Sequence, residues 1–265
     1  MFDDHLKRWS LIPDGEPIVT HCSHLLPVLC GGVPAMLKIA HEEEERRGPD
    51  LMIWWNGDGA ARVLARDGDA VLLERATGHR SLVQMAREDH DDEASRIICR
   101  VAARLHAPRR QALPELIPLR QWFAELEPAA SKHGGILARA AAVARELLDQ
   151  PREVGVLHGD LHHGNVLDFG ERGWFAIDPK RLLGERGFDF ANILRNPDLD
   201  IAKAPGRLAR QATIIAEAAR LDRTRLLRWI LAYAGLFAVW ILGDGDDATL
   251  DLTVAEIAAA EIAAG

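Results

Sequence analysis

The chain has 265 residues, which is enough for one large domain or two lobes. A hydrophobic fraction of 48% beside 27% charged residues is typical of a soluble globular protein. The net charge of −8 argues against a nucleic-acid partner and suits a cationic small molecule. The N-terminus is too charged for a secretory signal, and the three cysteines show no paired spacing. We expect a cytoplasmic monomer with no membrane partner.

The first part of the chain predicts a small β-rich lobe. Short apolar runs separated by turn residues are typical of strands. Between the first two runs, residues 20–24 fit either a nucleotide contact or a plain hairpin turn, and no G-x-G-x-x-G is present. The expected strands are residues 18–19, 25–29, 35–39, 62–65 and 70–73.

The rest of the chain predicts a larger, mainly helical lobe. Apolar residues recur there at i, i+3 and i+4, and the uncharged stretch 229–243 is shorter than a membrane span and predicts a buried helix. A strand followed by a glycine-containing linker places the boundary near residue 75, which gives an α+β, bilobal architecture with lobes 1–75 and 76–265. The expected helices are residues 94–106, 119–126, 136–148, 208–219, 225–242 and 250–264.

The most informative stretch reads VGVLHGDLHHGNVLDFGERGWFAIDP. Two short apolar runs flank the turn residues at 170–173, which predicts a β-hairpin. If Phe169 faces Trp174, then Asn165 faces Asp178 at the open end of the hairpin. A carboxylate and an amide oxygen brought together in this way suit Mg²⁺ that keeps water ligands and binds substrate phosphates.

Asp160 lies in a loop five residues before Asn165. Protein kinases have this layout in their catalytic loop, where an aspartate is the base and a following asparagine binds metal. Asp178 then takes the place of the metal-binding aspartate in the next kinase loop. We predict Asp160, Asn165 and Asp178 as catalytic residues, with Asn165 and Asp178 as the Mg²⁺ ligands.

Two other interpretations of this stretch stay open. Each aspartate could simply cap the hairpin or a turn. The cluster of His158, Asp160, His162 and His163 could instead hold the metal of a hydrolase. Zinc sites rich in imidazole usually draw ligands from distant loops, and the other histidines form no comparable cluster, which favours the kinase interpretation.

A single lysine, Lys38, interrupts the apolar run 35–39. A strand lysine is usually solvated, but protein kinases keep their phosphate-pairing lysine in V-A-I-K at this place. The glutamates 42–45 follow at once and predict the first turn of a helix. Lys38 is therefore expected to contact phosphate, and we favour Glu45 among the glutamates as its ion-pair partner.

These residues resemble a known family. H-G-D-L-H-H-G-N-V-L-D-F with A-I-D-P is similar to the aminoglycoside phosphotransferases, which share the protein-kinase-like fold. L-D-F-G-E-R-G-W-F-A-I-D-P-K, G-E-R-G-F-D-F-A-N-I and N-P-D resemble the streptomycin 6-phosphotransferase branch, and the likeness extends over essentially the whole chain. The resemblance implies ATP-dependent phosphorylation of the 6-hydroxyl of streptomycin's streptidine ring, which confers antibiotic resistance. The Lys180-Arg181 pair departs from the wider family.

The resemblance also implies roles for single residues. Asp160 would be the catalytic base, and Lys38 would reach the α- and β-phosphates of ATP. Backbone groups from Glu74 to Ala76 would contact adenine. Asp189 would brace the catalytic loop from a helix, and His158 would position the same loop.

The substrate carries two guanidinium groups, which bidentate carboxylates match best. It must lie beside Asp160, in the groove of the helical lobe. Acidic residues on loops near the later helices are therefore candidates, although each alone could be a solvated loop aspartate. They are Asp198, Asp200, Asp244, Asp246 and Asp247.

Two further functions remain as alternatives. A kinase of the same fold could act on another aminoglycoside or a small-molecule alcohol. The chain could also be a nucleotide-binding module without turnover, but the presence of Asp160, Asn165 and Asp178 argues against that.

Overall fold

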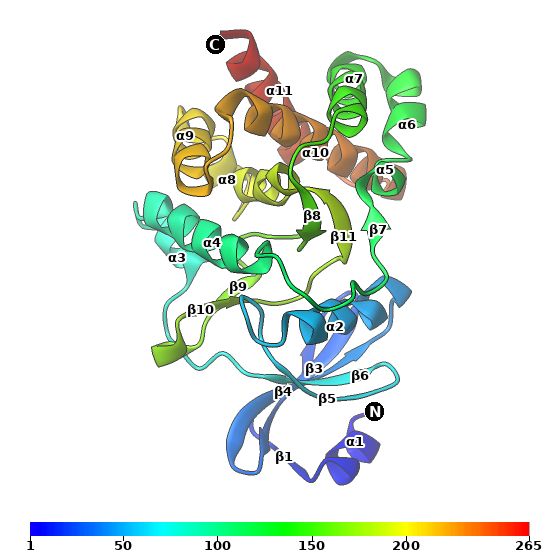
Figure 1. Ribbon diagram of the computed structural model, residues 1–265, viewed down its shortest axis with the longest axis vertical. Helices are drawn as coiled ribbons and strands as arrows, with labels where there is room; N and C mark the ends of the chain where they lie inside the picture. The colour runs from blue at the N-terminus through cyan, green and yellow to red at the C-terminus, as the bar shows by residue number, and fades with distance from the viewer. Residues whose placement is uncertain (265) are drawn as a thin grey trace.

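The β-rich part lies at one end of the molecule and the helical part at the other (Figure 1). The computed structural model describes residues 1–264, apart from the side chains of residues 43 and 44. This arrangement confirms the predicted α+β fold with a sheet-containing N-terminal part and a helical C-terminal part.

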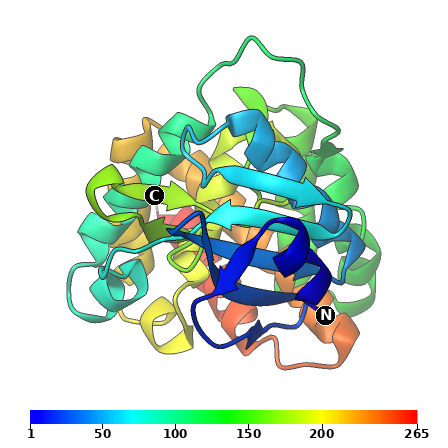
Figure 2. The same cartoon turned by 90° about the horizontal axis from the view of Figure 1, so that it is seen from below.

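The N-terminal part is built on an antiparallel sheet of six strands in the order β1-β3-β4-β6-β5, with β2 paired to β3. Seen from below, these strands lie in front of the helical part (Figure 2). All five predicted strands are present, each extended by no more than a few residues. The elements are α1 (Asp3–Arg8), β1 (Leu11–Pro13), β2 (Ile18–Val19), β3 (Ser23–Cys30), β4 (Val33–Ala40), α2 (Glu43–Trp55), β5 (Val63–Asp67) and β6 (Ala70–Glu74).

The helical part packs around a continuous apolar core. The helix α10 lies at its centre against α7, α11 and the 3₁₀ segment η2, and Trp229 and Tyr233 of α10 are fully buried. The elements are α3 (Leu82–Arg87), α4 (Asp91–Leu105), β7 (Ile117–Pro118), α5 (Leu119–Trp122), α6 (Leu126–His133), α7 (Gly135–Asp149), β8 (Val154–Leu157), β9 (Val166–Asp168), η1 (Gly170–Arg172), β10 (Trp174–Ala176), β11 (Leu182–Glu185), η2 (Arg186–Arg195), α8 (Leu199–Ala202), α9 (Arg207–Ala219), α10 (Arg223–Asp244) and α11 (Thr249–Ala264).

Within the described chain, α10 is the one helix that is long and apolar enough to cross a membrane by length and composition. Of its most apolar window, 67% is buried inside the protein. Its packing against three other elements identifies it as a core helix, as predicted for residues 229–243.

The predicted helix 119–126 is interrupted. The structure has α5 ending at Trp122 and α6 beginning at Leu126. Pro128 lies in the first turn of α6, where its missing N–H is harmless, whereas within a continuous helix it would remove a hydrogen bond and clash with the preceding turn. Residues 123–125 form a three-residue turn, the corner between the two helices.

The predicted register of the hairpin is wrong by one residue. The pairs are Trp174 with Asp168 and Ala176 with Val166, so Asn165 lies opposite Ile177, whose N–H donates to its carbonyl at 2.9 Å. The turn contains the short 3₁₀ segment η1 and uses five residues rather than four. One extra turn residue shifts every pair across the hairpin.

Candidate functional site

Asp160 is held in place by two amide groups. The Nδ2 of Asn192 donates to its Oδ1 at 2.7 Å, and the Nδ2 of Asn165 donates to its Oδ2 at 3.0 Å. Asn165 also donates to the backbone carbonyl of Asp160 at 2.9 Å. The Asp160 side chain is 25% exposed. A carboxylate with fixed orientation and partial access to solvent can accept a proton from a hydroxyl placed beside it.

Asp189, on η2, braces the loop that carries Asp160. Its fully buried carboxylate accepts hydrogen bonds from the backbone N–H groups of His158 and Gly159, at 2.8 and 2.7 Å. The Nε2 of His106 donates to the same carboxylate at 2.7 Å. These contacts agree with the bracing role that the family resemblance implies for Asp189.

His158 links the loop to the hairpin. Its Nε2 donates to the carbonyl of Ile177 at 2.8 Å, and its Nδ1 accepts from the backbone N–H of Asp160 at 3.2 Å. These bonds require the neutral imidazole with the proton on Nε2. Burial favours the same neutral form, because it lowers the pKa of His158. His158 therefore positions the segments that carry Asp160 and Asp178.

Asn165 and Asp178 sit at neighbouring positions at the open end of the hairpin. Because Nδ2 of Asn165 faces Asp160, its Oδ1 is the amide atom left for a metal, and it accepts no hydrogen bond in the part of the chain that the structure describes. Asp178 is 33% exposed and has a left-handed backbone with φ of 57°. One amide oxygen and one carboxylate with access to solvent fit Mg²⁺, which prefers oxygen ligands and retains waters.

Lys38 forms the predicted ion pair with Glu45 of α2. Its Nζ donates to Glu45 Oε2 and to Asp178 Oδ1, both at 2.6 Å. Lys180 Nζ donates to the other oxygen of Glu45 at 2.8 Å. Burial pushes the pKa of Glu45 upward, but the two lysines outweigh it and hold the pKa below its ordinary value. The sheet and the hairpin are thus joined through charged groups.

Glu74 and Ala76, the linker residues predicted to contact adenine, have different surroundings. The backbone N–H of Glu74 donates to the carbonyl of Arg62 at 3.0 Å, and its side chain pairs with Arg172. Ala76 packs with a smaller apolar cluster that includes Met36 and Ile177. Of the two, Ala76 is therefore the better placed to meet a flat apolar base.

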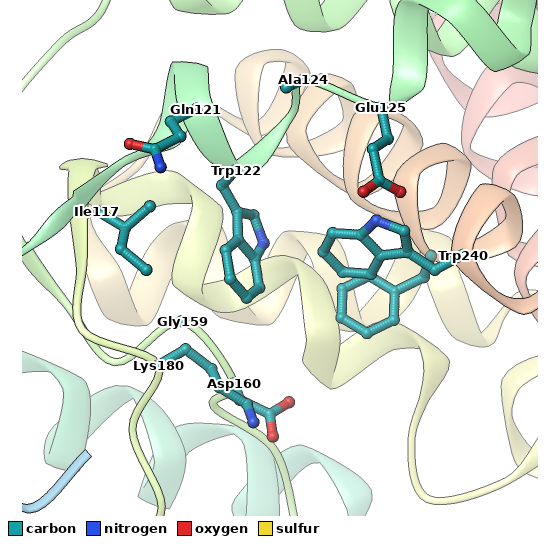
Figure 3. Close-up of a pocket in the computed structure, with 10 residues that line it drawn as sticks. Ile117, Gln121, Trp122, Ala124, Glu125, Gly159, Asp160, Lys180 and Trp240 are labelled. Atoms are coloured by element: carbon teal, nitrogen blue, oxygen red, sulfur yellow. The ribbon is translucent and has the colours of Figure 1, made fainter. Parts of the chain in front are cut away.

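A cavity of about 660 Å³ opens beside Asp160. The rings of Trp122 and Trp240 form one wall, with centroids 5.1 Å apart and planes at 86° (Figure 3). The Nε1 of Trp122 is buried and has no hydrogen-bond partner among residues 1–264 as described. The full lining is Ile117, Gln121, Trp122, Ala124, Glu125, Gly159, Asp160, Lys180, Phe237 and Trp240.

Besides Asp160, the lining of the cavity contains one further acidic residue, Glu125. It comes from the corner between α5 and α6 and faces the same cavity as Trp240 (Figure 3). Aromatic faces and a carboxylate are the groups that bind organic cations. Glu125 could not be identified from the sequence, because nothing in the local pattern distinguishes it from other exposed glutamates.

The five aspartates predicted for the substrate do not line the cavity. Asp198 caps α8 and pairs with Arg87, Asp200 pairs with Lys203, and Asp247 caps the start of α11 through Thr249. Asp244 ends α10, and Asp246 follows it. Their role in substrate binding stays a prediction, and local capping and surface ion pairs account for three of them.

The histidine cluster does not form a metal site. Among the described residues, no group of three or more histidine, cysteine, aspartate or glutamate side chains is arranged to hold a metal ion. The Nδ1 of His162 accepts from the backbone N–H of Gly164 at 3.0 Å, and fully buried His163 lies 3.5 Å from Asp91. This arrangement does not support the metallohydrolase alternative.

The fold and the arrangement of Lys38, Glu45, Asp160, Asn165 and Asp178 define a kinase-like phosphotransferase. Residues 8–245 match the family described as aminoglycoside/hydroxyurea antibiotic resistance kinase. The chain belongs to this family. A kinase family implies ATP as the phosphate donor.

Similar proteins include streptomycin kinases of two kinds. The chain is 52% identical to a streptomycin 3''-kinase of Klebsiella pneumoniae, over 94% of this chain and 97% of the relative. It is 32% identical to a streptomycin 6-kinase of Streptomyces glaucescens, over 98% and 88% of the two chains. A hydroxyurea phosphotransferase of Kitasatospora aureofaciens is also 32% identical, over 99% and 77%.

Solved structures share the fold. An apo thermostable mutant of aminoglycoside phosphotransferase APH(4)-Ia matches with a TM-score of 0.69 at 14% identity, over 98% of this chain and 99% of that chain. A choline/ethanolamine kinase family protein from Mesorhizobium loti matches with a TM-score of 0.67 at 15% identity, over 99% and 93%.

Proposed function

We propose that the protein transfers the γ-phosphoryl group of ATP to a hydroxyl of streptomycin. The observation that carries this proposal is the cavity beside Asp160, which has an aromatic wall and the carboxylate of Glu125. The size of the cavity suits a large ligand with a cationic body. The similarity to streptomycin kinases supports the same substrate.

The contacts of the site residues support the following roles. Asp160 takes the proton of the acceptor hydroxyl, and Lys38 pairs with the phosphates of the nucleotide. Asn165 and Asp178 would hold Mg²⁺, which supplies charge neutralisation at the phosphates. The backbone near Ala76 would contact adenine.

The remaining predictions on organisation belong to the same proposal. We place the lobe boundary near residue 75, with the nucleotide between lobes 1–75 and 76–265. We also propose that the protein is a monomer. A cytoplasmic location gives the enzyme access to ATP.

A separate question is which hydroxyl of streptomycin accepts the phosphoryl group. The resemblance to the 6-phosphotransferase branch implies the 6-hydroxyl of the streptidine ring, but the 52% identical relative is a streptomycin 3''-kinase. The 6-kinases are 32–33% identical. We therefore propose the 3''-hydroxyl as the acceptor, with the 6-hydroxyl as the alternative.

Phosphorylation of streptomycin by the purified protein tests both parts of the proposal. The assay couples ADP formation to a spectroscopic readout across streptomycin, other aminoglycosides and hydroxyurea, with Mg²⁺ and with a chelator. Phosphorus and proton NMR of the product then identifies the phosphorylated ring. ADP formation with another acceptor, and none with streptomycin, contradicts the substrate assignment. A phosphate on the streptidine ring contradicts the 3'' assignment alone.

A further inference from the structure

Lys180 lies on a short segment fixed to the catalytic loop. Its backbone N–H donates to the carbonyl of His158 at 2.7 Å. The residues on either side of the segment, Asp178 and Arg181, have left-handed backbones with φ of 57° and 55°. The backbone of Gly159 passes so close that a Cβ there would lie 2.8 Å from the Cβ of Lys180. The side chain of Lys180 therefore starts directly beside the loop that carries Asp160.

The ammonium group of Lys180 reaches the nucleotide side of the site. It donates to Oε1 of Glu45 at 2.8 Å, while Lys38 donates to Oε2 at 2.6 Å. Glu45 thus carries one negative charge between two ammonium groups. Lys38 also donates to Asp178 Oδ1 at 2.6 Å, so both ammonium groups have carboxylate partners, and a phosphate would bind Lys180 by exchange with Glu45.

The same side chain lines the acceptor cavity together with Asp160 (Figure 3). Lys38 does not line that cavity. Of the two lysines bound to Glu45, Lys180 is therefore the one located between the phosphate-binding side and the acceptor side. Its side chain is 22% exposed, and its four-carbon stem allows the ammonium group to change partners.

We propose that Lys180 is a second catalytic lysine, whose ammonium group contacts the γ-phosphoryl group as it moves from ATP to the acceptor. The proposal rests on the proposed phosphotransfer. The acceptor oxygen forms a bond to the γ-phosphorus, and the bond from that phosphorus to the β,γ-bridging oxygen breaks. The electron pair of the broken bond leaves with ADP, and the acceptor proton passes to Asp160. Lys180 neutralises charge on the non-bridging oxygens during this exchange.

A comparison of ADP with a non-hydrolysable ATP analogue tests the contact without an acceptor. Isothermal titration calorimetry with Mg²⁺ gives both affinities for the wild type, Lys180→Met and Lys180→Arg. We expect the wild type to prefer the triphosphate analogue, and Lys180→Met to lose about 10- to 100-fold of that preference, as for a charge-assisted hydrogen bond. ADP affinity should stay within about threefold, since one such bond to the γ-phosphate is absent from ADP. Arginine should restore part of the preference.

The control is Lys132→Met, which removes an exposed lysine from α6. Equal losses of ADP and analogue affinity in Lys180→Met would show that Lys180 only positions Glu45, and they would overturn the proposal. An unchanged preference for the analogue would overturn it as well.

Kinetics separate this proposal from the substrate assignment. If the wild type phosphorylates streptomycin, Lys180→Met should lower kcat by about 10²-fold while the KM for streptomycin changes little. A wild type that does not act on streptomycin contradicts the proposed function, but calorimetry still decides the role of Lys180. Normal kcat in Lys180→Met contradicts the catalytic role only.

Discussion

The proposed nucleotide side and the proposed acceptor side of the site are built in different ways. On the nucleotide side, Lys38 is bound by Glu45 and Asp178 at 2.6 Å each, so opposite charges are paired before any ligand binds. On the acceptor side, the wall consists of Trp122, Trp240 and Phe237 with the exposed carboxylate of Glu125. The first is a pre-formed charge network, and the second is an apolar surface with one acidic group.

This difference corresponds to two kinds of ligand. The phosphates of a nucleotide carry concentrated charge and need cations at fixed positions. A large organic cation spreads its charge over an apolar body, which aromatic rings can cover while a carboxylate neutralises it. Substitutions on the two sides should therefore alter different kinetic constants.

The largest effect is expected between the two sides, at Asp160. Asp160→Asn should lower kcat by about 10²-fold or more, because the acceptor loses its base. Nucleotide affinity should stay nearly intact, since the contacts of Asp160 are to Asn165, Asn192 and the loop. Steady-state kinetics and calorimetric titration with Mg-ATP measure the two quantities.

Asp178→Asn is the matched variant, because it removes the proposed metal ligand instead of the base. It should weaken Mg-nucleotide binding. If Asp160→Asn cannot bind Mg-ATP while Asp178→Asn binds it normally, the two roles have been assigned the wrong way round.

On the nucleotide side, Lys38→Ala should raise the KM for ATP and lower kcat. The loss of one charge-assisted contact corresponds to about 10- to 100-fold in ATP affinity. The KM for streptomycin should change little, and circular dichroism should show an intact fold. ATP kinetics like those of the wild type would mean that Lys38 serves only to join Glu45 and Asp178.

On the acceptor side, Glu125→Gln should raise the KM for streptomycin by about 10-fold, the lower end expected for an exposed charge-assisted hydrogen bond. ATP affinity should not change. Glu127→Gln is a matched control, since Glu127 lies two residues away on α6 and pairs with Arg145 at 3.3 Å. Equal streptomycin KM values for the two variants would exclude Glu125 from substrate binding. A selective increase in an alanine variant at one of the five predicted aspartates would place the cation there instead.

The grouping of the residues proposed for the nucleotide side could be predicted from the sequence because these residues have local signatures. Asp160 and Asn165 lie in one loop, and Asp178 follows at the end of the next hairpin. Lys38 interrupts an apolar strand, and Glu45 lies in the first turn of the helix that follows. The hairpin register was the exception, since one additional residue in a turn moves every pair and turn length is difficult to read from the sequence.

The acceptor side could not be predicted in this way. Trp122 and Trp240 lie far apart in the chain and meet only because α5 and α10 pack in the same lobe. The corner that presents Glu125 exists because a helix predicted as continuous ends at Trp122. A search for acidic loops near the end of the chain instead identified aspartates that cap helices or form surface ion pairs.

Acid should act on stability rather than on substrate binding, through the histidines of the catalytic loop. Burial lowers the pKa of His162 from 6.5 to about 4. Asp160 opposes this shift, whereas Arg195 and the neighbouring histidines His158 and His163 add to it. The unfolded chain therefore binds a proton more readily than the folded protein between these two pKa values.

The free energy of unfolding therefore has its full value above pH 6.5, where His162 is neutral in both states. It decreases as the pH falls toward 4. At pH 5 the loss amounts to about 2 kcal/mol relative to pH 7.5. Denaturant titrations at both pH values should show this decrease, and His162→Asn should reduce it, because asparagine can still accept the hydrogen bond from Gly164 without gaining a proton. His133→Asn, which removes an exposed histidine at the end of α6, should leave the decrease unchanged. An equal acid loss in all three proteins would assign it to other groups.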